Sequence, residues 1–359
     1  MASLPPPERI PPQETVQSAN VAAVRLTLPG AEAADGTAAP GTDLSDRINP
    51  RLISLGLTES RDEKADKLEL TLHNHDGLLA PIRKGVIITL ALGWIKGSEV
   101  TLGLVDKGRF TVDEVKKGGP PDVVTLTARS ADLGGRFRKR RDAIHKSTTL
   151  GAVVARIARA NGYRSRVHAS LASLPIAMAE QRGKSDMAFL HDLGKRYDAT
   201  ATVKDRTVIF APIGGGQTAA GTTLPTLALT KRHGWTWNFT EAQRDENDGA
   251  SAQYHDPATA RRRTARSGGT TNPRRLRRTY ASEADAQAAA DAQHQRQGRA
   301  QYSFDYELAF GDPAIVPGRP VTLTGWDSQI DAIRWTVKEA SHDMGADGLK
   351  SRITLDGRG

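Results

Sequence analysis

Apolar and polar residues alternate along most of this chain, and no other feature restricts its fold as strongly. A strand points successive side chains to opposite faces, so an alternating segment can bury one side of a sheet and expose the other. The rule holds in LELTLHN (68–74), VIITLALGW (86–94), VVTLTA (123–128) and IRWTVKE (333–339). Turn-forming pairs such as Asp76-Gly77, Gly97-Ser98 and Lys107-Gly108 separate such segments. The pattern predicts a mainly β protein made of antiparallel sheets.

The N-terminal third is expected to form one β domain after a short arm. Residues 1–14 are rich in proline and polar side chains, which predicts a disordered arm. Alternating segments then follow one another, beginning with a strand over 16–28. Their spacing predicts an antiparallel barrel or sandwich over residues 15–130.

The hydrophobic period changes between residues 131 and 222. Apolar residues from Leu150 to Ala158 recur at helical spacing, and Thr149 can cap the start of that helix. A second helix is expected from Asp186 to Tyr197, with Ser185 as its N-cap. Strands over 199–203 and 207–211 complete a predicted small α/β domain.

The last part of the chain returns to β structure. Residues 223–248 and 300–359 predict a second antiparallel barrel. In IRWTVKE, Trp335 alternates with polar neighbours, which predicts that it faces the barrel interior together with Ile333 and Val337.

An insertion over residues 249–299 interrupts the second barrel. Residues 249–280 are rich in Arg, Gly and Thr and have no apolar period, so we expect a long exposed loop or arm there. An Ala/Gln helix is expected over 282–297, because Ser282 and Asp285 form a start that resembles a capping box.

Positive charge is concentrated in two runs. The chain carries a formal net charge of +9. The run from Arg261 to Arg278 has eight arginines and no acidic residue, and the run from Arg129 to Lys146 has seven basic and two acidic residues. When their +8 and +5 are taken from +9, the remainder of the chain is at −4. The charge therefore predicts local contacts rather than general binding to nucleic acid.

The run from Arg261 to Arg278 needs either solvent or a partner. Eight uncompensated arginines cannot be buried together, so the run is either solvated or neutralised by a partner. The run lacks aromatic residues for base stacking, which weakens the nucleic-acid interpretation. A solvated loop and contact with an acidic protein surface both stay open. The partner-contact hypothesis names Arg261, Arg262, Arg263, Arg274, Arg275, Arg277 and Arg278.

Motifs for catalysis or metal binding are scarce. The absence of Cys excludes disulfides, thiolate nucleophiles and Cys-ligated metals. His73 and His75 share a strand face beside Asp76, but the spacing supplies no third ligand, so a solvated face is the better interpretation. We expect no catalytic residue, no cofactor, no resident metal and no small-molecule substrate. The chain contains no run of eighteen apolar residues, so no membrane-spanning helix is predicted.

Three long motifs carry a resemblance to a known family. The junction RSADLGGRFRKRRDAIHKSTTLGAVVARIARANGY precedes SDMAFLHDLGKRYDATATVKDRTVIFAP, and the chain ends with FGDPAIVPGRPVTLTGW and WTVKEASHDMGADGLKSRITLD. In this order they resemble the late control protein D family of contractile phage tails, the P2-like tail hub, over about residues 15–356. The layout is also similar to the T4-type central hub and to the hub portion of VgrG proteins of type VI secretion.

The resemblance implies a structural protein of a phage tail or phage-like particle, assembled in the bacterial cytoplasm. It implies a ring-shaped trimer, in which two tube-like β barrels per chain form a pseudo-sixfold ring between a hexameric tail tube and a trimeric spike. The implied partners are two further copies, a separate spike protein, the tail tube, other baseplate proteins and, as a further candidate, the tape measure protein. A peptidoglycan-degrading tail enzyme and a nucleic-acid-binding regulator of late genes remain the alternatives.

Overall fold

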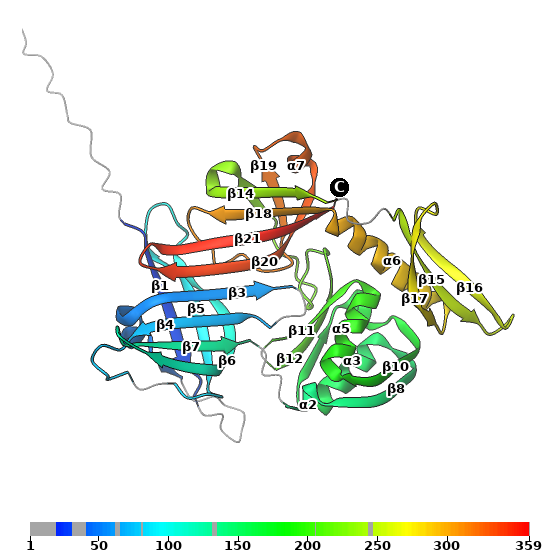
Figure 1. Ribbon diagram of the computed structural model, residues 1–359, viewed down its shortest axis with the longest axis horizontal. Coiled ribbons are helices and arrows are strands. Elements are labelled where there is room, and N and C mark those ends of the chain that lie inside the picture. The colour runs from blue at the N-terminus through cyan, green and yellow to red at the C-terminus, as the bar shows by residue number, and fades with distance from the viewer. Residues whose placement is uncertain are drawn as a thin grey trace, which may run out of the picture.

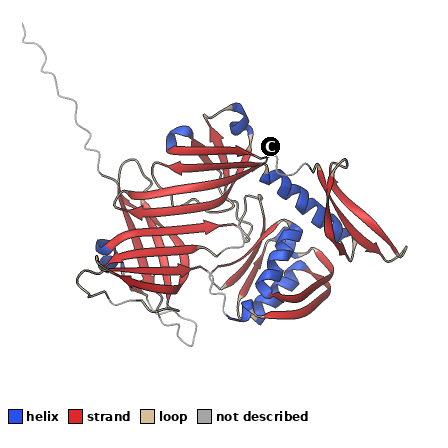
Figure 2. Cartoon of the chain, viewed as in Figure 1, coloured by secondary structure: helices blue, strands red, loops and turns tan. Residues whose placement is uncertain are grey.

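The computed structural model describes residues 19–30, 41–61, 65–79, 82–130, 135–204, 206–242 and 247–358. The arm predicted over residues 1–14 lies outside these ranges. A large β sheet occupies one side of the molecule, an α/β domain lies beside it, and a small sheet with one long helix lies at the far end (Figure 1). Figure 2 shows that the longer helices belong to the α/β domain and to the region beside the small sheet.

The large sheet has thirteen strands and draws on both ends of the chain. Its first β module consists of β1 (Val21–Leu28), β2 (Thr42–Asp43), β3 (Leu52–Ser60), β4 (Lys67–His73), β5 (Ile87–Lys96), β6 (Gly103–Gly118) and β7 (Val123–Arg129). Its second β module consists of β13 (Leu227–Thr230), β14 (Gly234–Glu241), β18 (Tyr302–Leu308), β19 (Pro320–Thr324), β20 (Arg334–Gly345) and β21 (Gly348–Arg358). Short helices accompany these strands, namely α1 (Ser45–Ile48), η1 (Asn49–Arg51), η2 (Lys231–His233) and α7 (Ser328–Ala332).

Strand β20 joins the two modules, which corrects the expectation of two closed barrels. Its first residues pair with β19, whereas its later residues pair with β3, from Glu339 opposite Ser60 to Met344 opposite Leu55. The described strands therefore form one open sheet that ends at β14 and β2 rather than two closed barrels. Alternation specifies which face of a strand is buried, but it does not specify the neighbouring strand, so the sequence pattern could not distinguish the two arrangements.

The predicted inward faces are confirmed in both modules. In the first module, Leu68, Leu70 and Leu72 are each at most 2% exposed. In the second, Trp335 is 2% exposed and Val337 is fully buried, with Ile333 beside them in the same core.

The turn predicted at Lys107-Gly108 is wrong, because both residues lie inside the long strand β6. Gly108 adopts a left-handed φ of +87° at a point where the pairing of β6 with β5 shifts register. A glycine at a β-bulge gives the same local signal as a glycine in a turn.

The α/β domain contains the predicted helices and strands. Its elements are α2 (Gly135–Arg138), β8 (Arg140–Thr149), α3 (Leu150–Ala160), β9 (Arg164–Val167), α4 (Ala169–Ala172), β10 (Pro175–Ser185), α5 (Asp186–Tyr197), β11 (Ala199–Lys204) and β12 (Thr207–Pro212). The side chain of Thr149 caps α3 by accepting a hydrogen bond from the backbone amide of Ala152, and that of Ser185 caps α5 by accepting one from the backbone amide of Ala188. The β8–β10 ribbon was not predicted, since most residues of β8 are exposed and show no apolar alternation.

Residues 249–280 do not form the loop that the sequence suggested. They form a mixed sheet of β15 (Gly249–Asp256), β16 (Arg261–Gly268) and β17 (Pro273–Tyr280). The central strand β15 pairs antiparallel with β16 and parallel with β17. We call this the Arg-rich sheet. One face packs on helix α6 (Glu283–Ala300) through alanines of both elements, including Ala250, Ala252 and Ala290, which are fully buried. Alanine is small and weakly hydrophobic, so this buried face gave no clear apolar period.

Candidate interaction surfaces

A buried group of charged side chains lies where the two β modules meet. Lys107 Nζ of β6 lies 2.5 Å from Glu59 Oε2 of β3 and 3.2 Å from His342 Nε2 of β20. His342 Nδ1 lies 2.7 Å from the hydroxyl oxygen of Ser351 on β21. The side chains of Lys107, Glu59 and His342 are 1%, 6% and 0% exposed. We call these four residues the buried junction.

The ionisation of Glu59 reflects these neighbours. Burial by itself raises the pKa of this carboxyl, but the hydrogen bond with His342 and the charge of Lys107 outweigh burial and lower the pKa to about 2. Burial lowers the pKa of Lys107, and the negative charge of Glu59 opposes that effect. We infer a charged pair, because removing either charge leaves the other buried without compensation.

Further polar contacts attach the α/β domain to the large sheet and α6 to the α/β domain. Lys204 Nζ lies 2.7 Å from Asp66 Oδ2, which connects β11 to the residues just before β4. Arg299 of α6 pairs with Asp198 at the end of α5. Tyr197 of α5 donates a hydrogen bond of 3.1 Å to Asp285, near the start of α6. The Arg-rich sheet is therefore mounted on a helix that is fixed to the rest of the molecule.

The partner-contact residues lie on two different strands of the Arg-rich sheet. Arg261, Arg262 and Arg263 belong to β16, whereas Arg274, Arg275, Arg277 and Arg278 belong to β17. The two strands flank β15 on opposite sides, so the fold gathers the two groups of arginines around one central strand.

Sequence reasoning missed the exposed aromatic side chains of β14. Trp235 is 77% exposed and Trp237 is 38% exposed, and β14 is an edge strand of the large sheet. The ammonium of Lys231 lies 5.3 Å from the centre of the Trp237 ring. An exposed edge strand with large apolar side chains is typical of a surface that is covered in an assembly. The segment WTWNF gave a strand signal but no indication of which face is open.

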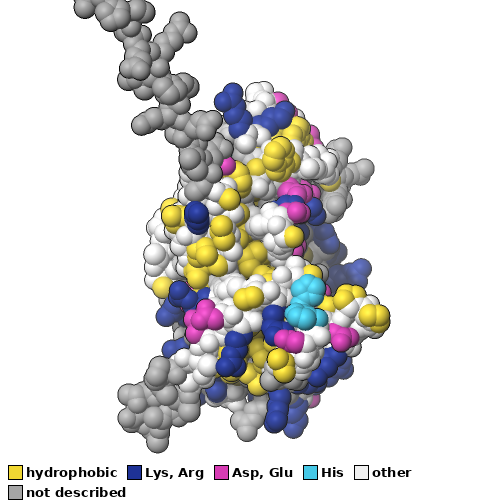
Figure 3. Space-filling model, turned by 90° about the vertical axis from the view of Figure 1, so that its left-hand side faces the viewer, with side chains coloured by type: hydrophobic (Ala, Val, Ile, Leu, Met, Phe, Trp, Pro, Cys, Tyr) yellow, Lys and Arg dark blue, Asp and Glu magenta, His cyan; other side chains and the backbone are white. Residues whose placement is uncertain are grey.

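Hydrophobic side chains also gather on the end of the molecule that faces left in Figure 1, where they are interspersed with charged groups (Figure 3). A cavity of about 490 Å³ in the first β module is lined mainly by apolar residues, among them Leu72, Leu78 and Ile82. Leu78 is 78% exposed.

The histidine pair considered for metal binding lies at the surface. His73 and His75 are both exposed, with ring centroids 6.5 Å apart. The carboxylate of Asp76 binds the guanidinium of Arg51 through two hydrogen bonds, and the one between Nη1 and Oδ1 is 2.8 Å long. Asp76 is therefore engaged with an arginine rather than directed to the imidazoles.

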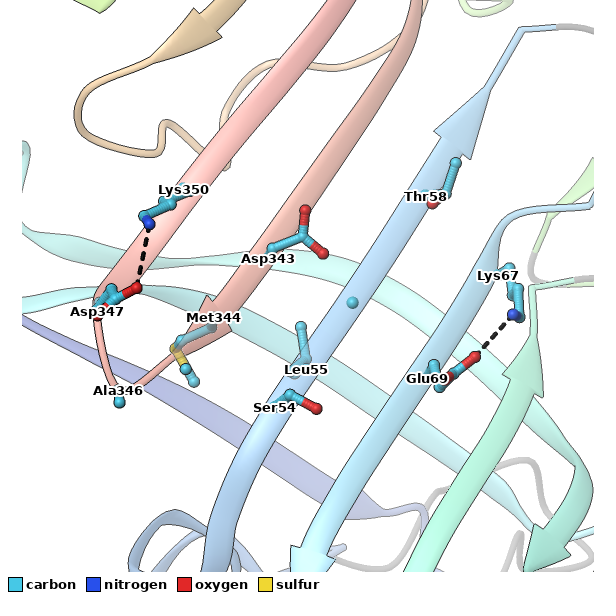
Figure 4. A pocket seen from close by; sticks show the side chains of 13 residues that line it. Ser54, Leu55, Thr58, Lys67, Glu69, Asp343, Met344, Ala346, Asp347 and Lys350 are labelled. Carbon is cyan, nitrogen blue, oxygen red and sulfur yellow. Dashed lines mark hydrogen bonds and ion pairs between the residues drawn. The ribbon is translucent and has the colours of Figure 1, made fainter. Parts of the chain in front are cut away.

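A polar hollow of about 460 Å³ lies at the seam of the two modules, between β3, β4 and the turn that joins β20 to β21 (Figure 4). Gly56, which has no side chain, lies opposite Asp343 of β20. The lysines that line the hollow are paired, Lys67 with Glu69 at 2.7 Å and Lys350 with Asp347 at 3.3 Å. Two of the charged pairs that line the hollow are therefore compensated within the chain.

None of the helices in the described ranges has the length and apolar character needed to cross a membrane.

Comparison with known proteins gives consistent matches. A model of the phage tail baseplate hub (GPD) family matches residues 69–348. A probable baseplate hub protein of Escherichia phage P2 is 32% identical over 356 residues, covering 88% of this chain and 91% of that protein. A probable baseplate hub protein of Escherichia phage 186 is 30% identical over 355 residues, covering 88% of this chain and 90% of that protein.

Solved structures share the fold at low sequence identity. A tail protein from Neisseria meningitidis MC58 superimposes with a TM-score of 0.63 at 12% identity, covering 94% of this chain and 96% of that one. A component of the type VI secretion system of E. coli, described as structurally similar to tail proteins of bacteriophage T4, has a TM-score of 0.53 at 13% identity. That match covers 86% of this chain and 74% of the other.

Proposed function

The chain belongs to the phage tail baseplate hub (GPD) family, and we propose that three copies form a ring that joins a sixfold tail tube to a threefold spike. Membership confirms the resemblance read from the sequence and identifies the protein as a structural component of a phage tail baseplate. The ring, its symmetry and its partners are the proposal.

The observation that carries this proposal is the edge-to-edge pairing of β20 with β3. It places two β modules side by side in one sheet within each chain. Three such chains present six β modules, which is the number needed to meet a sixfold tube while the subunits themselves keep threefold symmetry. The exposed edge strand β14 supports the proposal, because unpaired strand edges are commonly covered in assemblies.

We expect the purified chain to form a trimer, or to become one when its spike protein is added. Light scattering or sedimentation would give the mass in solution, and negative-stain microscopy would show the outline of a ring. A species that stays monomeric at micromolar concentration, with and without the spike protein, would contradict the proposal.

We also propose that the Arg-rich sheet contacts another protein of the particle. Support comes from its position at one end of the molecule and from its exposed arginines (Figure 1). Each exposed ion pair contributes only about 0.2–1 kcal/mol, so such a contact depends on several arginines together.

Replacing Arg261, Arg262, Arg263, Arg274, Arg275, Arg277 and Arg278 with serine should therefore impair particle assembly. The measurement is the yield of complete particles when the variant supplies the only hub protein, with circular dichroism as the control for folding. Normal assembly of functional particles by a folded variant would mean that this surface is merely solvated.

A further inference from the structure

The Arg-rich sheet has one covered face and one open face. On β15, Ala250, Ala252 and Tyr254 are buried against the α6 side. Successive residues of a strand alternate in direction, so Ser251 and Gln253 belong to the opposite face. Ser251 is 7% exposed and Gln253 is half-buried, and the flanking strands supply the exposed side chains of this open face. The strand register then assigns residues of the flanking strands to the same two faces.

Four arginines fall on the open face. Ser251 pairs with Arg266 on β16 and with Arg275 on β17. Arg262 of β16 is four residues from Arg266 and therefore shares its face. Arg277 follows Leu276, which packs against the covered cluster, so Arg277 points the other way. All four arginines are exposed.

The open-face arginines lack acidic partners within the described residues, whereas two arginines of the covered side, Arg263 and Arg278, have partners there. Arg263, on the covered side, lies 2.9 Å from the carboxylate of Asp256, and Arg278 lies 6.0 Å from the ring of Tyr280. Within the described ranges, no carboxylate forms an ion pair with the open-face arginines, which are Arg262, Arg266, Arg275 and Arg277.

The open face is also held rigidly. Ser282 caps α6 by accepting the amide of Asp285 at 3.2 Å, and Gln287 of α6 donates a hydrogen bond of 3.0 Å to the carbonyl of Arg266. Neighbouring strands are about 4.8 Å apart, so Arg266 and Arg275 originate about 10 Å apart on either side of Ser251. Arginines fixed at this spacing repel one another until anions lie between them.

We propose that this open face binds an acidic segment of another protein, whose Asp and Glu carboxylates lie between Arg266 and Arg275, above Ser251. The inference rests on the proposed function, because it takes the partner to be another protein of the particle. The planar guanidinium matches a carboxylate with two parallel hydrogen bonds, and a rigid sheet loses less entropy on binding than a loop.

Nucleic acid fits this face less well. Tyr254 and Tyr280, the tyrosines of the sheet, are buried in the covered cluster and cannot stack on bases. The open face offers His255 but no tryptophan, tyrosine or phenylalanine.

The test measures binding of the full-length protein to fluorescent probes by anisotropy. One probe is a glutamate peptide of about 20 residues and the other is a DNA duplex of about 20 base pairs, each titrated at low and moderate salt. The face variant replaces the open-face arginines with glutamine, at Arg262, Arg266, Arg275 and Arg277. A control variant removes the same charge from exposed residues elsewhere, at Lys96, Lys117, Lys139 and Arg166.

We expect the wild type to bind the peptide, the control variant to bind within about twofold of it, and the face variant to bind about tenfold or more weakly. Equal weakening in both variants would show a response to net charge alone and would overturn the inference. Tighter binding of the duplex than of the peptide, lost only in the face variant, would overturn it in favour of nucleic acid.

Two readouts keep the result interpretable. The face variant should melt at the same temperature as the wild type or higher, because like charges are removed. If it melts lower, the double variant of Arg266 and Arg275 to glutamine replaces it in the same assay. A wild type that forms trimers without binding the peptide refutes this inference and leaves the proposed function standing, whereas failure to form trimers counts against the proposed function.

Discussion

Replacing Trp335 with alanine should lower the free energy of unfolding by about 3–5 kcal/mol. The indole is 2% exposed and packs against the rings of Phe239 and Phe304, with centroids 6.3 Å and 5.7 Å away. Its Nε1–H donates a hydrogen bond of 3.0 Å to the carbonyl of Ile330. Directly across the strands lies Gly357, where even a Cβ would meet the indole at 2.7 Å. The truncation therefore leaves a large cavity in a well-filled core.

Trp235→Ala is the matched control for this variant. The same residue type lies on β14 with 77% of its surface exposed, so its removal should change stability by no more than about 0.5 kcal/mol. Urea unfolding followed by circular dichroism measures both variants. A change within about 0.5 kcal/mol for Trp335→Ala would contradict its burial in the second β module.

Replacing Lys107 with methionine should cost about 3–5 kcal/mol, because it leaves the buried carboxylate of Glu59 without its counter-charge. Methionine keeps most of the length and volume of lysine, so the effect reports the lost charge rather than a cavity. A double variant, Lys107→Met with Glu59→Gln, should recover part of the loss, because no unpaired charge then stays buried.

Lys116→Met tests the same change at the surface of the same strand. Lys116 pairs with Glu114 at 3.2 Å, but its side chain is 66% exposed, so the cost should stay below about 1 kcal/mol. A similar cost at Lys107 and Lys116 would mean that the buried junction does not hold the two modules together.

The pH dependence of the free energy of unfolding tests the buried junction independently. The pKa of Glu59 is lowered from 4.5 to about 2, so its contribution to stability is complete above the unfolded pKa of about 4.5. That contribution is lost as the pH falls from about 4.5 towards 2. Removing Lys107 raises the pKa of Glu59 towards its unfolded value, so the Lys107→Met variant should lose less stability than the wild type between about pH 4.5 and 2, as measured by urea unfolding at several pH values.

Local signals in the sequence predicted individual elements well. The helical stripe from Leu150 to Ala158 and the caps Thr149 and Ser185 lie where expected, because a cap and its helix are adjacent in sequence. The inward direction of Trp335 followed from alternation alone. Such features depend on backbone geometry within a few residues, which the sequence specifies directly.

The Arg-rich sheet shows where sequence reasoning stopped. Its arginines were identified, but the run was expected to be a loop because its buried face consists mainly of alanines. The two faces became distinguishable only when the register placed Arg266 and Arg275 beside Ser251. Register is set by neighbouring strands and by the covering helix, which no local pattern encodes.

Local patterns in the chain were enough to establish the β character of both modules, the helical middle region and the family to which the chain belongs. The connection of the two modules through β20 and the buried contact of Lys107 with Glu59 and His342 became visible in the folded molecule. Lys107 and His342 are 235 residues apart. Their contact depends on how distant strands share hydrogen bonds and exclude water, and that is a property of the packed molecule rather than of any segment.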